Sequence, residues 1–375
     1  MHYDEIEQEL ADAITGRSAG LSLDAPELDR LHQRVESLPI FKQFKHPGFR
    51  SLCGVGPILP RAVVRRLLER AATVGTPAAV GELRAFFELD RGVTRATVWV
   101  RNVTANIPLD LGSGVRALPI SALADAELAQ SIQSHRASTS PGEGLLLEID
   151  DTRNPFFFDA PNPMEKMPHE WGPFPGVELI EETIKLMTLV GPSCPVAALQ
   201  TGKVVTPGGG TSFHHPEVVA VGRSTVMTEE VRTLRPLYKA LSPKGRKIID
   251  RAISRLNLAC RRGSPSDVAL DAAIALETAL GGSERTELTY RLALRAAFLL
   301  ETGAAQRRAV WTLVKELYST RSRVVHTGST EAVGVDGSEW TRLIARALRR
   351  ILEVGGIPDW DTLVLSNGSD PGILT

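Results

Sequence analysis

The sequence predicts an α+β protein, in which a mixed α/β N-terminal domain with a small sheet precedes a C-terminal all-α bundle. Between residues 103 and 221, several short segments alternate apolar and polar residues, as half-buried strands do. From Thr228 onward, apolar residues recur with the helical period, and Gly or Pro separates successive segments. We expect three parts: an α+β domain over residues 1–225, a helical bundle over residues 226–356 and a tail over residues 357–375.

Helices are expected in the first 90 or so residues. The segment 21–31 begins with capping and proline signals, and the segment 60–70 opens with Pro60, at a position where helices tolerate proline. The pattern then changes to a period of two, which predicts strands. The expected strands are residues 103–110, 115–120, 145–149, 196–205 and 218–221.

Helices over residues 122–132 and 177–187 are expected to interrupt these strands, and a loop rich in proline and aromatic residues covers 154–163. The glycine run at 208–210 lacks the Lys-Ser/Thr pair of a phosphate-binding loop, so we interpret it as a turn. The side chains of the two adjacent histidines that follow diverge, and no third ligand stands nearby in sequence. We therefore expect no metal and no cofactor.

Six helices are expected after Thr228, joined by loops short enough to make neighbouring helices antiparallel. Ser242 followed by Pro243 is typical of a helix start, and Gly281 with Gly282 is typical of a helix end. The expected helices are residues 229–241, 242–262, 266–280, 284–302, 304–325 and 338–354.

The composition is that of a globular protein, because 43% of the 375 residues are hydrophobic and 23% are charged. It excludes fibrous, disordered and disulfide-stapled proteins. No apolar stretch reaches the ~18 residues that a membrane helix needs, and the acidic N-terminus does not resemble a signal peptide. Cys53, Cys194 and Cys260 form neither a CxxC pair nor a zinc spacing, so we expect a reduced, cytoplasmic protein with no membrane partner.

The net charge of −1 conceals an asymmetry along the chain. Residues 229–354 hold 22 Lys and Arg against 14 Asp and Glu, a balance of +8, whereas residues 1–228 hold 21 against 27, a balance of −6. A basic C-terminal half suits a polyanionic partner. Solvated helix faces explain the same surplus without any partner, so charge alone leaves both interpretations open.

An arginine and a histidine with four residues between them close the fifth expected helix of the bundle. Arg321 and His326 stand in the segment Leu317-Tyr-Ser-Thr-Arg-Ser-Arg-Val-Val-His-Thr-Gly, which runs into the helix stop Thr327-Gly328. A pair with this spacing is common by chance, so only its context makes it informative. His326 is the only one of the eight histidines with an arginine at this distance before it.

A carboxylate is expected inside the third helix of the bundle. Residues 266–280 are apolar nearly all round, which predicts a buried helix, yet Glu277 lies within it. A buried carboxylate needs a cationic or hydrogen-bonding partner, and Arg295 and Arg321 are the candidates. A structural ion pair that sets the helix register accounts for Glu277 and Arg295 without any functional role, so both interpretations stay open.

Four segments of the expected helical bundle follow one another in a characteristic order and at a characteristic spacing. They are Ala252-Ile-Ser-Arg-Leu-Asn-Leu-Ala, Asp271-Ala-Ala-Ile-Ala-Leu-Glu, Leu294-Arg-Ala-Ala-Phe-Leu-Leu and Leu317-Tyr-x-x-Arg-Ser-x-Val-Val-His-x-Gly. Together they resemble the Apea-like branch of the HEPN superfamily, helical domains whose hallmark is an Arg-x4–6-His motif. The resemblance covers about a third of the chain. The N-terminal region shows a looser likeness to the α+β domains that often precede this module.

The resemblance implies a metal-independent endoribonuclease that acts in anti-phage defence and abortive infection, or as a toxin. Arg321 and His326 would be catalytic, and Ser322 stands where active members carry a polar residue. Other members are catalytically silent, so the alternatives are a non-catalytic HEPN module for RNA or nucleotide binding or for dimerisation, or the toxin of a HEPN–nucleotidyltransferase pair. Residues 1–225 are expected to sense a trigger, select the substrate or restrain the activity, because uncontrolled RNA cleavage harms the host. The expected partner of these residues is a regulatory protein or a phage component.

The chemistry of RNA cleavage suits these residue types. Histidine titrates near neutral pH and can accept the proton of the ribose 2′-OH or protonate the leaving 5′-oxygen. Arginine stays charged and stabilises the extra negative charge on phosphorus. Five residues turn a helix by about 140°, so Arg321 and His326 do not share a face. In a homodimer, two motifs facing across a twofold axis would bring two histidines and two arginines to one groove, which predicts a composite active site.

Further residues are expected around this groove. Tyr318, one turn before Arg321, is suited to stack on a base or to bond the phosphate, and core packing is the alternative. Glu277 and Arg295 are expected to support the site. The expected ligands of the RNA backbone are Arg323, Arg307 and Arg308, with further basic character from Arg342, Arg346, Arg349 and Arg350.

Overall fold

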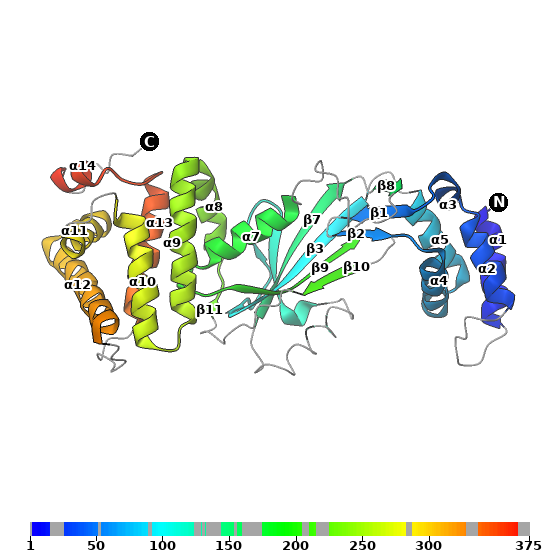
Figure 1. Ribbon diagram of the computed structural model, residues 1–375, viewed down its shortest axis with the longest axis horizontal. Coiled ribbons are helices and arrows are strands. Elements are labelled where there is room, and N and C mark those ends of the chain that lie inside the picture. Colours follow the sequence, from blue (N-terminus) through cyan, green and yellow to red (C-terminus); the bar gives the residue numbers. More distant parts are fainter. Residues whose placement is uncertain are drawn as a thin grey trace. The chain divides into compact units, whose positions relative to one another are not determined.

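The computed structural model of the chain is mixed α+β, which confirms the predicted class (Figure 1). None of the helices that it describes combines the length and the apolar character needed to cross a lipid bilayer. The expected strand at 218–221, most of the expected helix at 122–132, and Cys53 lie outside the described residues. The structure describes residues 2–15, 26–51, 54–88, 92–123, 129, 132, 144–153, 156–159, 175–204, 210–214, 225–282, 287–327 and 337–366.

The chain divides into two compact units. The first consists of residues 1–97, 149–178 and 200–213, and the second consists of residues 98–148, 179–199 and 214–375. The second unit therefore combines the helical C-terminal region with strands and a helix from the middle of the chain. These units are groups of residues in mutual contact, whereas the predicted boundary at residue 225 separates domains that fold independently. The boundary therefore stays a prediction.

Amphipathic helices open the first unit. Proline lies in the first turn of four of them, where its fixed φ suits a helix and its missing N–H costs no hydrogen bond. Their apolar faces form a core that includes Leu10, Leu31, Leu67 and Val80. The helices are α1 (His2–Thr15), α2 (Pro26–Glu36), α3 (Pro39–Gln43), α4 (Pro60–Val74) and α5 (Thr76–Phe87).

A hairpin interrupts these helices between α3 and α4. β1 (Pro47–Ser51) pairs antiparallel with β2 (Gly54–Pro57) on one side and with β8 (Phe156–Asp159) on the other. The Phe157 ring of β8 lies 5.8 Å, centroid to centroid, from the rings of Phe86 and Phe87. The prediction of helices throughout this region missed the hairpin, because its strands are too short to show an alternating pattern.

A six-stranded sheet has the strand order β10-β9-β3-β7-β6-β5. β6, β7 and β9 lie where strands were predicted. β3 was missed, and so was β10, which begins at Gly210 in the run interpreted as a turn. Residues 96–100 of β3 are all buried, so both of its faces are covered and no alternation appears. The strands are β3 (Gly92–Arg101), β5 (Leu109–Asp110), β6 (Val115–Pro119), β7 (Gly144–Arg153), β9 (Val196–Val204) and β10 (Gly210–His214).

The single strand predicted at 103–110 is in fact two short strands. β4 (Val103–Thr104) pairs parallel with β11 (Thr225–Val226), and β5 pairs antiparallel with β6. Pro108 lies between β4 and β5 and has no N–H to donate to a strand ladder. The two ends of the predicted strand therefore belong to different sheets.

Six described helices of the second unit after residue 228 lie where they were predicted, with ends shifted by a few residues. The Ser242 hydroxyl accepts a hydrogen bond from the Gly245 N–H at 3.1 Å, which confirms the predicted helix start. Gly282 has a φ of +70° after α10, which confirms the predicted glycine stop. The helices are α8 (Glu230–Ala240), α9 (Pro243–Arg261), α10 (Pro265–Leu280), α11 (Leu288–Leu300), α12 (Ala304–Thr327) and α13 (Gly337–Glu353).

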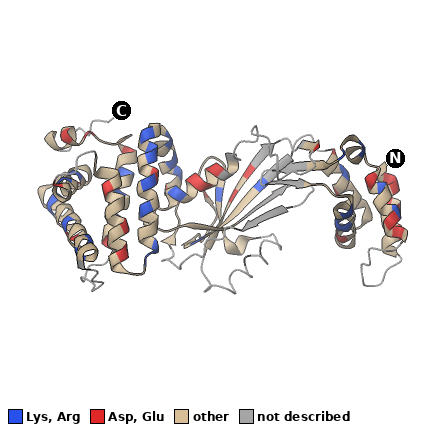
Figure 2. Cartoon of the chain, in the orientation of Figure 1, with Lys and Arg blue, Asp and Glu red and all other residues tan. Residues whose placement is uncertain are grey.

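Helix α10 is the centre of this region and packs against α9, α11, α12 and α13. In Figure 2 it is mostly tan with a few red segments, since it is almost wholly apolar apart from its acidic residues. A short helix, α14 (Trp360–Leu365), lies within the residues expected to form a tail and packs on α11. Its Trp360 and Leu363 are buried. Six residues are too few to show a helical period, so the sequence pattern does not reveal this helix.

A buried arginine joins α8 to α7 (Pro175–Met187) within the second unit. Arg235 is 3% exposed, and its Nε lies 3.1 Å from Glu182 Oε1. Its terminal nitrogens donate to the carbonyl of Gly112 and the hydroxyl of Thr183. Burial lowers the pKa of Arg235, and the nearby carboxylates act against that shift. The charge is thus tolerated inside the protein because two elements outside α8 supply its partners.

Arg235→Ala is expected to lower the free energy of unfolding by about 3 kcal/mol, because it leaves buried acceptors without their cation. Arg232 offers a matched control on the same helix: its side chain is 58% exposed and pairs with Asp110 at 3.2 Å. Arg232→Ala should cost less than about 1 kcal/mol. Urea denaturation followed by circular dichroism measures both variants, and equal losses would contradict the structural role of Arg235.

Candidate functional site

The predicted Arg-His motif lies in the C-terminal half of α12. Buried Val314, Leu317 and Tyr318 belong to this helix, which packs against α10 and α11. Arg321 follows one turn later, and His326 lies in the last turn of the helix. Packing of the middle of α12 therefore fixes where the motif begins, while its end projects beyond the packed turns.

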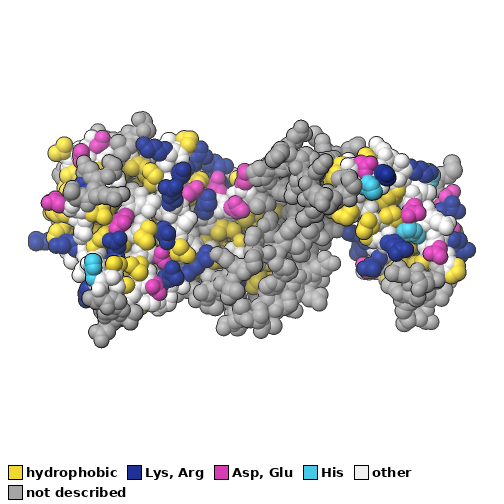
Figure 3. All heavy atoms as spheres, viewed as in Figure 1, with side chains coloured by type: hydrophobic (Ala, Val, Ile, Leu, Met, Phe, Trp, Pro, Cys, Tyr) yellow, Lys and Arg dark blue, Asp and Glu magenta, His cyan; other side chains and the backbone are white. Residues whose placement is uncertain are grey.

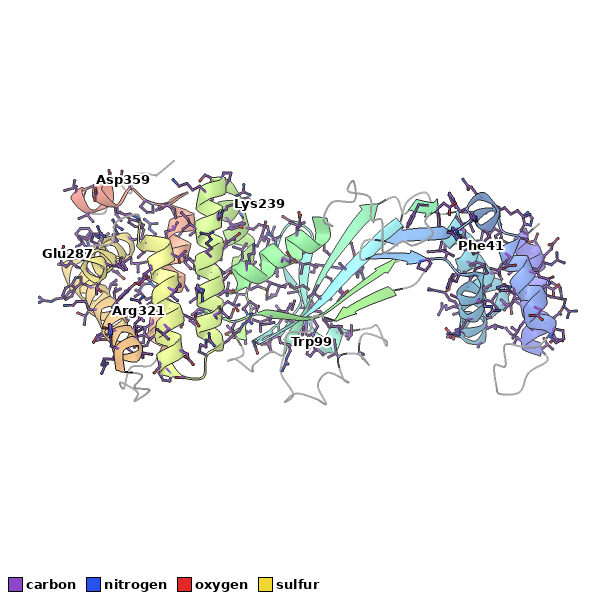
Figure 4. All side chains as sticks on the ribbon, in the orientation of Figure 1. Phe41, Trp99, Lys239, Glu287, Arg321 and Asp359 are labelled. Atoms are coloured by element: carbon purple, nitrogen blue, oxygen red, sulfur yellow. The ribbon has the colours of Figure 1, made fainter. Side chains whose placement is uncertain are left out.

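An ion pair and a hydrogen bond connect α12 to α10 at this point. Nη1 of Arg321 lies 3.4 Å from Oε1 of Glu277, and the Tyr318 hydroxyl donates to the same oxygen at 3.0 Å. The guanidinium carbon of Arg321 also lies 5.8 Å from the centroid of the Tyr318 ring. Of the two partners predicted for Glu277, the structure pairs it with Arg321, which is labelled in Figure 4.

Water reaches both members of this ion pair. The side chains of Arg321 and Glu277 are 36% and 26% exposed, so Glu277 is less buried than its apolar helix predicts. A guanidinium carries five N–H donors in a fork, and one carboxylate oxygen occupies only part of them. Arg321 is therefore oriented by its neighbours and still accessible to an anionic ligand.

Tyr318 belongs to the core beneath this pair. It is 5% exposed, and its hydroxyl also lies 3.4 Å from the carbonyl of Ala273. Burial, and next the neighbouring Glu277 carboxylate, raise the pKa of Tyr318. A ring this buried offers no face to a nucleobase, so core packing describes it better than stacking, and its hydroxyl serves to hold Glu277.

Arg295 has a different structural role from the one expected. Its Nη1 donates to the carbonyls of Leu280 and Gly281 at 2.7 and 2.6 Å, where the last carbonyls of α10 lack helical partners. Its guanidinium carbon lies 5.5 Å from the centroid of the Trp360 ring. Arg295 therefore caps α10 and holds α14 beside it.

His326 is exposed at the end of α12, together with Ser322 and Arg323. Beside it, Val325 is 60% exposed. Among the described residues, His326 has no hydrogen-bond or ion-pair partner. The helical repeat sets it about 140° from Arg321 around the axis, so one chain does not direct both side chains to the same point.

The three arginines expected to hold an RNA backbone are not gathered at the motif. Arg307 and Arg308 lie near the start of α12, about 20 Å along its axis from Arg321. Arg307 donates to a backbone carbonyl at 2.8 Å, and its guanidinium carbon lies 4.0 Å from the centroid of the Phe298 ring. Arg308 and Arg323 are exposed at opposite ends of the helix. Only Arg323 lies beside the motif.

Carboxylates offset the basic residues expected on the last long helix. Arg346 pairs with Glu301 at 2.6 Å and Arg349 pairs with Glu230 at 2.8 Å. Arg350 pairs with a carboxylate of its own helix at 3.2 Å. The positive charge on α13 is therefore largely neutralised by its surroundings.

A second carboxylate on α10, which the sequence pattern only placed at the start of a motif segment, has a defined structural role. Asp271 is 4% exposed, and its two oxygens lie 3.2 Å from Nη1 of Arg255 and 2.8 Å from Nε of Arg262. Both arginine side chains remain 46% exposed. The signal that singled out Glu277, an acidic residue in an apolar helix, would also have found Asp271.

Comparison with protein-family models, with curated protein sequences and with solved structures finds no match to this chain. The HEPN resemblance therefore stays a prediction from the four sequence segments quoted above. What the structure adds is the surroundings of the Arg-His motif. Those surroundings are a half-exposed guanidinium fixed by a carboxylate and a tyrosine hydroxyl, and an exposed imidazole further along the same helix.

The free energy of unfolding is expected to fall as the pH rises above about 10, the pKa of tyrosine in an unfolded chain. The native state retains the Tyr318 proton because its pKa is raised, whereas the unfolded chain releases it. Stability should then decline by about 1.4 kcal/mol per pH unit for this group. Denaturation between about pH 9 and 11 should show a flatter decline for Tyr318→Phe.

The control for this pH dependence is Tyr290→Phe, since the Tyr290 side chain is 54% exposed. Equal slopes for the two variants would show that the Tyr318 hydroxyl is not held in its protonated form by the fold.

Proposed function

We propose that this chain is a metal-independent endoribonuclease of the HEPN type that acts as a homodimer, with Arg321 and His326 as its catalytic residues. The observation that supports this proposal most is the environment of Arg321. Glu277 orients its guanidinium, and 36% of the arginine side chain is still exposed to solvent. An exposed imidazole on the same helix, that of His326, supplies a group of the kind that accepts and donates protons in catalysis. In this proposal residues 226–356 form a HEPN-like bundle and residues 1–225 a regulatory domain.

The proposed reaction is an intramolecular transfer at phosphorus. His326 accepts the proton of the ribose 2′-OH, the 2′-oxygen attacks the adjacent phosphorus, and the 5′-oxygen leaves with a proton from a second imidazole. Arg321 stabilises the additional negative charge on the phosphoryl oxygens, as preorganised donors do in other phosphoryl transfers. The products are a 2′,3′-cyclic phosphate and a 5′-hydroxyl, so a DNA strand is not a substrate.

A homodimer is proposed because one chain offers one motif histidine, whereas the reaction uses an acid and a base. Across a twofold axis, two α12 ends supply two imidazoles and two guanidiniums. The dimer is therefore proposed from the need for a second proton-transfer group.

The biological setting proposed is anti-phage defence, including abortive infection, or the action of a toxin in the cytoplasm. Cleavage of RNA would stop growth of the cell, which fits either setting. The regulatory role of residues 1–225, toward a phage component or a regulatory protein, follows from the need to restrain such an activity.

A second candidate function is a non-catalytic HEPN module for RNA or nucleotide binding or for dimerisation. The ion pair between Arg321 and Glu277 favours it, because this contact gives the guanidinium a structural role that needs no substrate. In this alternative, Glu277 and Arg321 set the register of α10 against α12, and the bundle serves as a scaffold. The toxin of a HEPN–nucleotidyltransferase pair is a separate alternative, which the identity of the neighbouring gene tests.

Purified protein is expected to cleave labelled tRNA and mRNA in the presence of EDTA. Arg321→Ala and His326→Ala should each reduce the rate at least about 100-fold, the usual contribution of a proton-transfer or charge-stabilising group. Lys315→Ala is the control, because it removes an exposed charge from the same helix outside the motif. Equal cleavage by all four proteins would end the catalytic assignment. RNA binding without any cleavage would favour the second candidate.

Mixing wild-type protein with His326→Ala protein tests the composite site. If both histidines act at one site, exchanged dimers are inactive, and activity should fall with the square of the wild-type fraction. If each chain is an independent enzyme, activity falls in direct proportion to that fraction. A linear dependence, with subunit exchange verified by mass spectrometry of isotopically labelled chains, would contradict the proposed dimer mechanism.

A further inference from the structure

Helix α9 carries a row of basic side chains along its exposed side. With 3.6 residues per turn, these side chains lie within an arc of about 80° around the helix axis, and they span about 27 Å along it. Figure 2 shows blue segments recurring along α9, and Figure 3 shows dark blue side chains over the same helix. The α9 basic row consists of the exposed residues Lys244, Lys247, Arg251, Arg255 and Arg262, the last of which caps the helix.

The row keeps a surplus of positive charge. Arg255 and Arg262 share the buried carboxylate of Asp271, and Asp267 adds a second carboxylate near Arg262. The other three members of the row have no ion-pair partner among the described residues. Five cations therefore face two carboxylates. On α13, by contrast, several arginines are each matched by a carboxylate.

Asp271 gives two members of the row a defined position. From α10, its two oxygens pair with the guanidiniums of Arg255 and Arg262, and both arginine side chains remain 46% exposed. Because one carboxylate fixes both arginines, they lose less conformational freedom when they bind an anion than free side chains would. This end of the row is thus prepared for an anionic ligand.

The chemistry of the row favours a nucleic-acid backbone over an acidic protein. A protein interface has an apolar or aromatic core surrounded by polar residues. The large apolar side chains exposed among the described residues lie on other elements, and the apolar side of α9, which includes Ile249, Ile253 and Leu256, is buried. A line of cations without an apolar centre matches the repeating phosphates of a nucleic-acid strand.

We propose that the α9 basic row binds the sugar–phosphate backbone of a nucleic-acid strand without selecting its sequence. The row is separate from the motif on α12, but both are attached to α10, through Asp271 and Glu277 respectively. The inference rests on the proposed function only in naming RNA as the natural strand. In that role the row holds a strand that also reaches Arg321.

Binding of a fluorescein-labelled 20-nucleotide oligouridylate tests the proposal by fluorescence anisotropy at several salt concentrations. The His326→Ala background keeps the strand intact. Lys247→Gln/Arg251→Gln should weaken binding about tenfold at low salt and reduce the slope of log K against log salt by about 1.4, at 0.7 per phosphate contact. Exposed, charge-neutralising substitutions of this kind are not expected to alter folding, which circular dichroism verifies.

The matched control is Arg61→Gln/Arg65→Gln on α4, which removes two exposed charges with the same spacing of four residues. This control should change the affinity for the oligouridylate, and the slope of log K against log salt, much less than Lys247→Gln/Arg251→Gln does. Equal effects of the two double variants would overturn the proposal, because the α9 row would then contribute only net charge. Equally tight binding of a 20-residue polyglutamate, lost in the same α9 variant, would overturn it in favour of an acidic protein partner.

Failure of this inference and failure of the proposed function give different results. If the α9 variants lose binding but the wild type never cleaves RNA, the surface assignment holds and the nuclease proposal fails. If the wild type cleaves RNA while the α9 variants bind as the control does, the nuclease proposal holds and this surface assignment fails.

Discussion

Two carboxylates on the otherwise apolar helix α10 hold arginines of the helices on either side of it. Asp271 binds Arg255 and Arg262 from α9 and its end, and Glu277 binds Arg321 from α12. Six residues separate the two carboxylates, which turns them about 120° apart around the helix. A carboxylate as buried as Asp271 is costly without a cation, so its pairing constrains the register of α9 against α10. Glu277 is partly solvated, and its pair with Arg321 constrains the register of α12 less strongly.

This arrangement gives the two proposed functional surfaces a common support. Arg321 at the motif and two arginines of the α9 basic row, Arg255 and Arg262, are oriented from the same helix, and the side chains of all three are more than a third exposed. Preorganised cations bind and stabilise anions more effectively than flexible ones, since less order has to be imposed on binding. Packing of α10 thus connects the stability of the bundle to the geometry of its charged surface.

The helical region was largely predictable, because period, caps and glycine stops all agree there, as at Ser242 and Gly282. The six-stranded sheet was less predictable from the sequence. Strand β3 is buried on both faces and therefore lacks the alternation that reveals a half-buried strand. For the site, sequence reduced the partners of Glu277 to two arginines, and only the packing of α12 against α10 decides between them. Helix geometry fixes the angle between His326 and Arg321, whereas the composite site in a homodimer stays a prediction.

The environment of Arg235 bears on how the helical region was acquired in evolution. Its acceptors at Thr183 and Gly112 lie 52 and 123 residues earlier in the chain. A recombination event that transferred only the helices after residue 228 to a new N-terminal partner would leave this guanidinium uncompensated. Exchange between proteins would therefore have to carry the earlier segments along, or replace Arg235 with an apolar residue in the same step.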